Sequence, residues 1–112
     1  MSAASTQDPR LYTSIAATQD FVPLGDGAIS WLRQDDDVRA GTCVYTLAEA
    51  GGRHAIDFGV SETLLVLEGR IRLEMSGGPT VELGPGESAS FERGARGDWI
   101  LVEDARLFFV ST

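Results

Sequence analysis

The sequence predicts an all-β protein, a sandwich or barrel built from short antiparallel strands. Glycine punctuates the chain every few residues from Gly25 onward, and 13 of the 112 residues are glycine. The runs between the glycines are short and rich in Val, Ile, Leu, Thr and Phe, which is typical of strands joined by tight turns. A chain of this length forms one domain with a single modest core.

Nine strands follow from these runs, and one short helix is expected near Asp8–Ala17. Residues 1–10 are small and polar, so we expect a flexible N-terminal segment followed by one domain over residues 11–112. The expected strands are Ala28–Arg33, Gly41–Leu47, His54–Phe58, Thr63–Leu67, Arg70–Met75, Thr80–Leu83, Ser88–Phe91, Trp99–Glu103 and Arg106–Val110.

The clearest pair of strands is the hairpin formed by Arg70–Met75 and Thr80–Leu83. Apolar and charged residues alternate along both runs, so each strand has one buried and one solvated face. The sequence Ser-Gly-Gly-Pro at 76–79 supplies the turn, because glycine adopts positive φ at little cost. This hairpin lies at the surface of the domain.

The run Thr63–Leu67 differs, because both of its faces are apolar. Leu64 and Val66 share one face, while Leu65 and Leu67 share the other. A strand with this pattern is buried on both sides. The barrel interior covers one face, so the second face needs an N-terminal strand or another subunit, and we expect a homodimer.

Composition excludes several classes of partner. The formal net charge of −8 argues against nucleic acid and anionic membranes, which need a basic surface. Cys43 is the single cysteine, which excludes an intrachain disulfide and a CxxC zinc site. No apolar run approaches a membrane span or a signal sequence, so a cytoplasmic protein is expected. The acidic run Asp35–Asp37 is interpreted as a solvated loop in preference to a metal site.

Three stretches together resemble the cupin family. They are ETLLVLEGRIRL from Glu62, VELGPGESASFERGARGDWIL from Val81, and ARLFFV from Ala105. The order and spacing are similar to the small single-domain branch that includes ethanolamine-utilisation and ureidoglycine-aminohydrolase-like cupins. The resemblance covers residues 41–111 and implies a jelly-roll barrel of two antiparallel sheets around a small cavity.

The chain departs from the metal-binding cupins at most of their ligand positions. Their first motif places two histidines before a glutamate that is followed, six residues later, by glycine. Glu62 and Gly69 fit the second half, but the histidine positions fall on Ile56 and Phe58, or one residue earlier on each. The third histidine is replaced by Gly97. We therefore expect no metal and no other cofactor.

If a metal does bind, Glu62 and the single histidine, His54, are its expected ligands, and Cys43 is a conceivable third. His54 has the same strand parity as Ile56, so it is expected to face the barrel interior. A transition metal needs three or four converging ligands, and nothing in the spacing demands that these residues converge.

Glu62 then becomes the leading catalytic candidate. A carboxylate among apolar side chains is desolvated, which raises its pKa and suits it to acid–base chemistry. The alternative is a hydrated Glu62 at the rim, paired with Arg53 or Arg96. The full set of candidates is Glu62, Tyr45 and His54 for catalysis, with Trp99, Phe58, Ile56, Cys43, Arg96 and Leu101 for ligand binding.

Three functions remain open. The first is a metal-independent cupin that binds a small organic molecule and acts on it through Glu62, as an isomerase, cyclase or lyase. The second is a non-catalytic binding or accessory domain. The third is a metal-dependent enzyme with unorthodox ligands. The fold alone cannot choose among them, because cupins host many unrelated functions.

Overall fold

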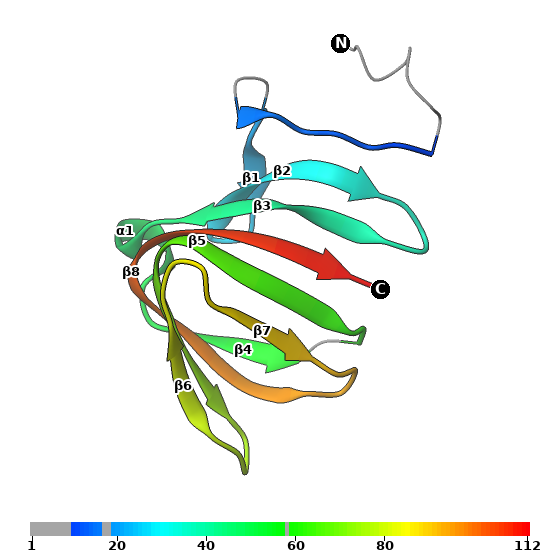
Figure 1. Ribbon diagram of the computed structural model, residues 1–112. Coiled ribbons are helices and arrows are strands. Elements are labelled where there is room, and N and C mark those ends of the chain that lie inside the picture. The colour runs from blue at the N-terminus through cyan, green and yellow to red at the C-terminus, as the bar shows by residue number, and fades with distance from the viewer. Residues whose placement is uncertain (1–9, 17–18, 58) are drawn as a thin grey trace.

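The computed structural model describes residues 10–16, 19–57 and 59–112, and in these ranges most residues lie in β-strands and very few in helix. This confirms the predicted fold class (Figure 1). No helix in the same ranges is long and apolar enough to cross a membrane. The elements are β1 (Val22–Leu24), β2 (Gly27–Gln34), β3 (Arg39–Tyr45), α1 (Leu47–Ala50), β4 (Arg53–Asp57), β5 (Glu62–Met75), β6 (Thr80–Leu83), β7 (Ser88–Phe91) and β8 (Arg96–Ser111).

Two long strands, β5 and β8, connect the two layers of the barrel. Residues 62–66 of β5 pair with residues 107–111 of β8, and β7 and β3 extend this first layer on either side. Residues 71–75 of β5 pair with residues 97–101 of β8, and β6 and β4 extend the second layer. All pairings are antiparallel, and β2 and β1 complete the first layer beyond β3. The jelly roll is therefore one sheet folded over along β5 and β8 (Figure 1).

Strand β5 bends at Gly69. The register between β5 and β8 shifts on both sides of this residue, at Glu68 and Arg70. Gly69 has φ +82°, and a Cβ atom here would overlap the backbone oxygen of Asp104 on β8. A bulge that bends the strand thus requires glycine for both conformation and space.

The core lies between the two layers. Val66, Ile71 and Leu73 on β5 are at most 2% exposed, and Leu101 and Leu107 on β8 pack in the same cluster. The period of two holds on each side of Gly69, and the bulge there brings both Val66 and Ile71 to the inward face.

The outer face of β5 is only partly covered. Leu67 is 40% exposed, so burial of the strand on both faces is incomplete in one chain. The segment before β1 lies against this layer, because Gln19 hydrogen-bonds to Thr42 at 3.4 Å and to Arg106 at 3.2 Å. The Arg106 guanidinium also lies 5.4 Å from the Phe21 ring centroid. The N-terminal segment, one of the two predicted covers, therefore contributes.

Several predicted boundaries need correction. The runs Thr63–Leu67 and Arg70–Met75 form one strand, because Gly69 makes a bulge and not a turn. Trp99–Glu103 and Arg106–Val110 also merge, because Ala105 stays paired with Tyr45. The predictions missed β1 and α1.

The helix expected near Asp8–Ala17 is wrong for residues 10–16, which contain no α-helix, while residues 8, 9 and 17 lie outside the described ranges. Alternation alone cannot tell a bulge from a turn. The flexible segment expected at residues 1–10 also falls almost wholly outside those ranges and stays a prediction.

Candidate functional site

A partly open cavity of about 210 Å³ lies between the two layers, and we call it the inner cavity. Its walls are mainly aliphatic and aromatic side chains, with protic side-chain groups from Cys43, Tyr45, Glu62 and the Trp99 indole. The lining residues are Leu24, Cys43, Tyr45, Ile56, Glu62, Leu64, Ile71, Leu73, Phe91, Trp99, Leu107 and Phe109. The site is thus a small apolar chamber with a few polar groups, as ligand sites usually are.

Glu62 is the first residue of β5, and cross-strand pairing fixes its position between Phe91 of β7 and Ser111 of β8. The Ser111 hydroxyl donates a hydrogen bond of 2.9 Å to Glu62 Oε1. Burial raises the pKa of Glu62 above its ordinary value of 4.5, and the hydrogen bond from Ser111 partly opposes this shift. The desolvated carboxylate expected from the sequence is therefore present at this position.

Cys43 and Tyr45 reach the same cavity from β3, because residues two apart on a strand share a face. They form a side-chain hydrogen bond with each other. Burial raises the pKa of the Cys43 thiol to about 11, and it raises the pKa of the Tyr45 hydroxyl well above its usual value of 10. Both groups carry their protons at neutral pH, so Cys43 is not a thiolate nucleophile. Each group can therefore act as a hydrogen-bond donor at the cavity wall.

Trp99 forms one wall of the cavity and is held between two rings. Its centroid lies 5.0 Å from Tyr45 in a tilted contact and 4.2 Å from His54 in a stacked contact with an interplanar angle of 17°. The β4–β8 register pairs His54 directly with Trp99. Two neighbouring side chains on adjacent strands thus stack, and the indole is the one that reaches the cavity.

The structure corrects the expected position of His54, whose side chain is not part of the cavity wall. His54 Nε2 donates to the Ala50 carbonyl at 2.9 Å, and Nδ1 lies 3.8 Å from a carboxylate oxygen of Asp26. Parity along β4 was right, but parity gives the face of a strand and not the depth along it. His54 is therefore placed to orient Trp99.

The other predicted ligand-binding residues divide into three groups. Ile56 lines the cavity beside Trp99. Leu101 is 3% exposed and belongs to the core, outside the cavity lining. Arg96 is also absent from the lining, because its side chain is 69% exposed and pairs with Asp57 at 3.5 Å. Phe58 lies outside the described residues.

The residues present do not fit a metal centre. Within the described ranges, no group of three or more His, Cys, Asp and Glu side chains is placed to hold a metal ion. The one histidine is engaged with Ala50 and stacked on Trp99, while Ile56, at a position where metal-binding cupins carry histidine, contributes only a hydrocarbon side chain. One carboxylate with a protonated thiol is a poor ligand set for a transition metal.

A second pocket of about 260 Å³ opens next to the inner cavity, and we call it the outer pocket. The two share Leu24, Glu62 and Phe109, so Glu62 stands at their junction. The lining residues of the outer pocket are Leu24, Trp31, Asp36, Asp37, Arg39, Val60, Glu62, Phe109, Ser111 and Thr112. Sequence reasoning missed this pocket, because it depends on which loops meet at the barrel end.

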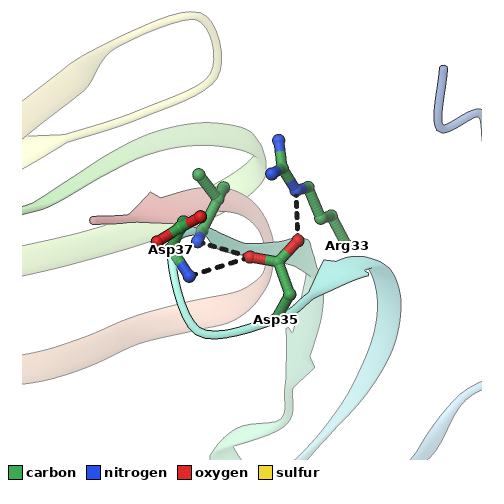
Figure 2. A network of polar contacts seen from close by, with 4 residues as sticks. Arg33, Asp35 and Asp37 are labelled. Atoms are coloured by element: carbon green, nitrogen blue, oxygen red, sulfur yellow. Dashed lines mark hydrogen bonds and ion pairs between the residues drawn. The ribbon is translucent and has the colours of Figure 1, made fainter. Parts of the chain in front are cut away.

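The loop between β2 and β3 contributes Asp36 and Asp37 to the lining of the outer pocket. The side chain of Asp35 holds this loop in its conformation through hydrogen bonds (Figure 2). Asp35 Oδ1 accepts hydrogen bonds of 2.9 Å from the backbone N–H groups of Asp37 and Val38, and Oδ2 accepts one of 2.6 Å from Arg33 Nε. These bonds, that from Arg33 first, lower the pKa of Asp35 to about 2. The solvated-loop interpretation of this run holds for Asp35, which acts as a turn residue.

Several solved structures share this architecture, and the following three are examples. A protein of unknown function from Rhizobium leguminosarum is 25% identical, with a TM-score of 0.66 over 79% of this chain and 82% of that one. The EutQ protein of Clostridium difficile is 14% identical, with a TM-score of 0.61 over 76% and 68%. Ectoine synthase from P. lautus is 19% identical, with a TM-score of 0.72 over 88% and 72%. No curated protein matches.

The family model for the EutQ-like cupin domain matches residues 39–106, which is more than half of the chain. This range contains most of the inner cavity, including Cys43, Tyr45, Glu62 and Trp99. The jelly-roll topology and the neighbouring structures agree with this match. The chain therefore belongs to the EutQ-like cupin domain family, with the small-molecule-binding fold of the cupins.

Proposed function

We propose that the protein binds a small organic molecule in the inner cavity and that Glu62 transfers a proton on it without the help of a metal. One observation carries the proposal. Glu62 is a carboxylate on the wall of an otherwise largely apolar chamber, and no cationic side chain is among the residues that line that chamber. A carboxyl group in this setting is a functional candidate by its chemistry.

The chemistry follows from the protonation states. Because burial raises the pKa of Glu62, its carboxylate is a stronger base than an exposed one and its acid form persists closer to neutrality. Tyr45 and Cys43 keep their protons and can donate hydrogen bonds that hold a ligand oxygen near Glu62. Isomerisation, cyclisation and elimination need one group that removes and returns a proton, which Glu62 supplies.

Size and precedent agree with this assignment. An apolar cavity of about 150 Å³ holds a benzene molecule, so a cavity of 210 Å³ suits a ligand of about eight non-hydrogen atoms. The walls formed by Trp99 and Ile56 exclude bulk water from one side of such a ligand. Ectoine synthase, one of the structural neighbours, is an enzyme built on the same fold. Catalysis inside a barrel of this kind therefore has precedent.

The test begins with a library of small metabolites, screened by thermal shift against the wild type and the variant Glu62→Gln. Compounds that bind are incubated with each protein, and their conversion is followed by NMR in heavy water, which also reports proton exchange at carbon. We expect conversion or exchange with the wild type and at least a hundredfold loss with Glu62→Gln.

A matched control is Glu68→Gln. Glu68 lies on the same strand, but its side chain is 73% exposed and pairs with Arg106 outside the cavity. This variant should behave as the wild type. Equal turnover by Glu62→Gln and the wild type would contradict the proposed role of Glu62. Elemental analysis of protein purified without chelator tests metal independence, and a stoichiometric transition metal would overturn that part.

A non-catalytic binding domain is the second candidate, and the mainly apolar lining of the inner cavity favours it. Ile56 occupies a position of the family's metal motif with a hydrocarbon side chain, which is compatible with a cavity kept only for binding. Binding without conversion or exchange of any ligand in the same screen would support this function. The homodimer expected from β5 stays a prediction, and a solution mass of one chain at micromolar concentration would refute it.

A further inference from the structure

We infer that the ligand of the inner cavity is an organic cation: an ammonium group on an apolar body of about eight non-hydrogen atoms, with its charge at Glu62 and its body against the aromatic walls. The inference rests on the proposed function only in taking the inner cavity as a binding site. It does not depend on whether Glu62 also catalyses a reaction. Charge, wall chemistry and the acidic pocket that adjoins the cavity each support it.

The first support is the absence of a positive partner for an anion within the cavity lining. The sequence contains nine basic residues, all of them arginine, and none lines the inner cavity. Arg53 donates to Glu74 at 2.5 Å and to Asp98 at 3.2 Å, and Arg96 pairs with Asp57. A carboxylate or phosphate ligand would therefore meet Glu62 without compensation. Arg96, expected to bind a ligand, therefore lies outside the lining of the inner cavity.

The second support is the desolvation of Glu62 itself. The carboxylate receives a hydrogen bond from Ser111 but faces a cavity without cationic side chains. Removing a charge from water is costly unless it is paired, and a bound ammonium offsets this cost. A neutral ligand of the same shape leaves the cost in place. The cavity is thus electrostatically complementary to a monovalent cation.

The third support is the chemistry of the walls. Tyr45, Phe91, Trp99 and Phe109 all line the chamber that Glu62 borders. Aromatic faces attract cations, and the attraction is stronger where the contact is shielded from water. The same rings provide apolar contact for the rest of the ligand. A carboxylate together with several aromatic rings is how proteins recognise organic ammonium groups.

The pocket that adjoins the inner cavity is acidic as well. The outer pocket meets the inner cavity at Glu62, and Asp36 and Asp37 line it. Its one basic lining residue is Arg39, whose guanidinium lies 5.1 Å from the Trp31 ring centroid. The net charge of −8 adds a field that attracts cations to the whole molecule. The electrostatic field therefore favours entry of a cation over an anion.

A bare metal ion does not satisfy these observations. Among the described residues, the carboxylates of the outer pocket and Glu62 do not form a group able to hold a metal. The aliphatic and aromatic side chains that line the rest of the inner cavity also offer no ligand atoms to a metal ion. An organic cation uses both the carboxylate and the rings.

The test compares three probes of nearly equal shape: benzylammonium, benzyl alcohol and benzoate. The chain has two tryptophans, and their indole N–H signals in NMR report on different places, since Trp99 lines the inner cavity and Trp31 the outer pocket. Substitution of each tryptophan by phenylalanine assigns the signals. Titration at low salt then gives a dissociation constant for each probe and identifies the pocket it enters.

We expect benzylammonium to shift the Trp99 signal with a dissociation constant at least tenfold lower than that of benzyl alcohol, and benzoate to leave this signal unchanged. Glu62→Gln should remove the tenfold preference without weakening benzyl alcohol. The double variant Asp36→Asn, Asp37→Asn should weaken benzylammonium about twofold to fivefold, with less effect at high salt. Glu68→Gln should match the wild type, because its charge lies outside the cavity.

Three outcomes would overturn the inference, and they bear differently on the proposed function. Equal affinity of benzylammonium and benzyl alcohol, both shifting Trp99, refutes the charge preference but leaves the cavity as a binding site. Shifts of Trp31 alone place the cation in the outer pocket and refute binding inside. Failure of all three probes to shift Trp99 refutes both the inference and ligand binding in the inner cavity.

Discussion

Glu62 and Gly69 stand at the two ends of the same stretch of β5, ETLLVLEG, yet the fold uses them in opposite ways. Glu62 places a carboxylate in an apolar cavity, where burial raises its pKa. Gly69 places no side chain at all where β5 bends, because a Cβ atom would overlap the backbone of Asp104. The first residue costs stability and offers chemistry, whereas the second makes the bend possible.

The difference shows which part of a family signature reports function. The glycine is needed by any chain that folds one sheet over into this barrel, whatever the barrel binds. The glutamate is not needed for the fold, since an apolar or amide side chain would be less costly at the same position. A partly buried carboxylate at the wall of an otherwise apolar cavity is therefore the stronger indication of a site.

The largest effect is expected for Gly69→Ala. The positive φ costs about 1–2 kcal/mol for a residue with a Cβ, and overlap with the Asp104 carbonyl adds a further backbone shift, so we expect a loss of about 3 kcal/mol or more. Urea unfolding measures it. Gly86→Ala is the matched control, because its φ is +84° and no atom lies within 4 Å of the added Cβ. Equal losses in the two variants would show that strain at positive φ, and not the bend, sets the requirement.

Trp99→Ala should have the next largest effect. The side chain is partly buried, stacks on His54 and makes a tilted contact with Tyr45, so its loss should lower the free energy of unfolding by about 2–3 kcal/mol. Removal of this wall also admits water, so the pKa of Glu62 should fall toward its ordinary value of 4.5. An NMR titration of the carboxyl carbon follows that shift. Val81→Ala is the control, since Val81 is exposed on β6 and lies outside the cavity lining, and an equal change in the Glu62 pKa would contradict this account.

Glu62→Gln should stabilise the protein at pH 7, in contrast to the two variants above. The folded-state pKa of Glu62 is raised, so the cost of its burial is absent below about 4.5 and appears as pH rises through the folded-state value. Because the side chain is partly solvated and accepts a bond from Ser111, we expect a gain below about 1 kcal/mol. Urea unfolding at pH 7 and pH 4 should show the gain at pH 7 alone. Glu68→Gln should give no change, and a loss of stability in Glu62→Gln would refute the claim that this carboxylate is costly.

Much of the cavity was predictable because a strand has a period of two. Glu62 followed from the family signature, while Cys43 and Tyr45 followed from alternation along one run. Ile56 and Trp99 followed from positions in the family motifs, and all five residues line the inner cavity. The alternation of apolar and polar residues along a strand shows which face each side chain lies on, and the face determines whether that side chain points into the barrel.

The rest depended on distances along the barrel that no local pattern contains. His54 has the parity of Ile56 but lies behind Trp99, because the β4–β8 register pairs these two residues. The same register places Arg96 opposite Asp57, and the two side chains form an ion pair. Leu24 was missed because β1 has only three residues and no alternation to detect. Phe109 required knowledge that β8 runs unbroken through both layers.

The smallest effect is expected at a carboxylate that behaves in the opposite way to Glu62. Hydrogen bonds from Arg33, Val38 and Asp37 lower the pKa of Asp35 to about 2, so its contribution to stability is present above its ordinary value of 3.8 and is lost as pH falls through about 2. Asp35→Asn keeps an oxygen for the backbone N–H groups but removes the charge paired with Arg33, so it should be slightly less stable than the wild type at pH 7 and equal to it near pH 2. The effect of Glu62→Gln on stability has the opposite sign, because this variant becomes more stable than the wild type as pH rises above about 4.5. Urea midpoints of both variants, with Asp36→Asn as the control in the same loop, would show the two trends crossing. Parallel trends would mean that net charge, and not the local partners of each carboxylate, governs the response to pH.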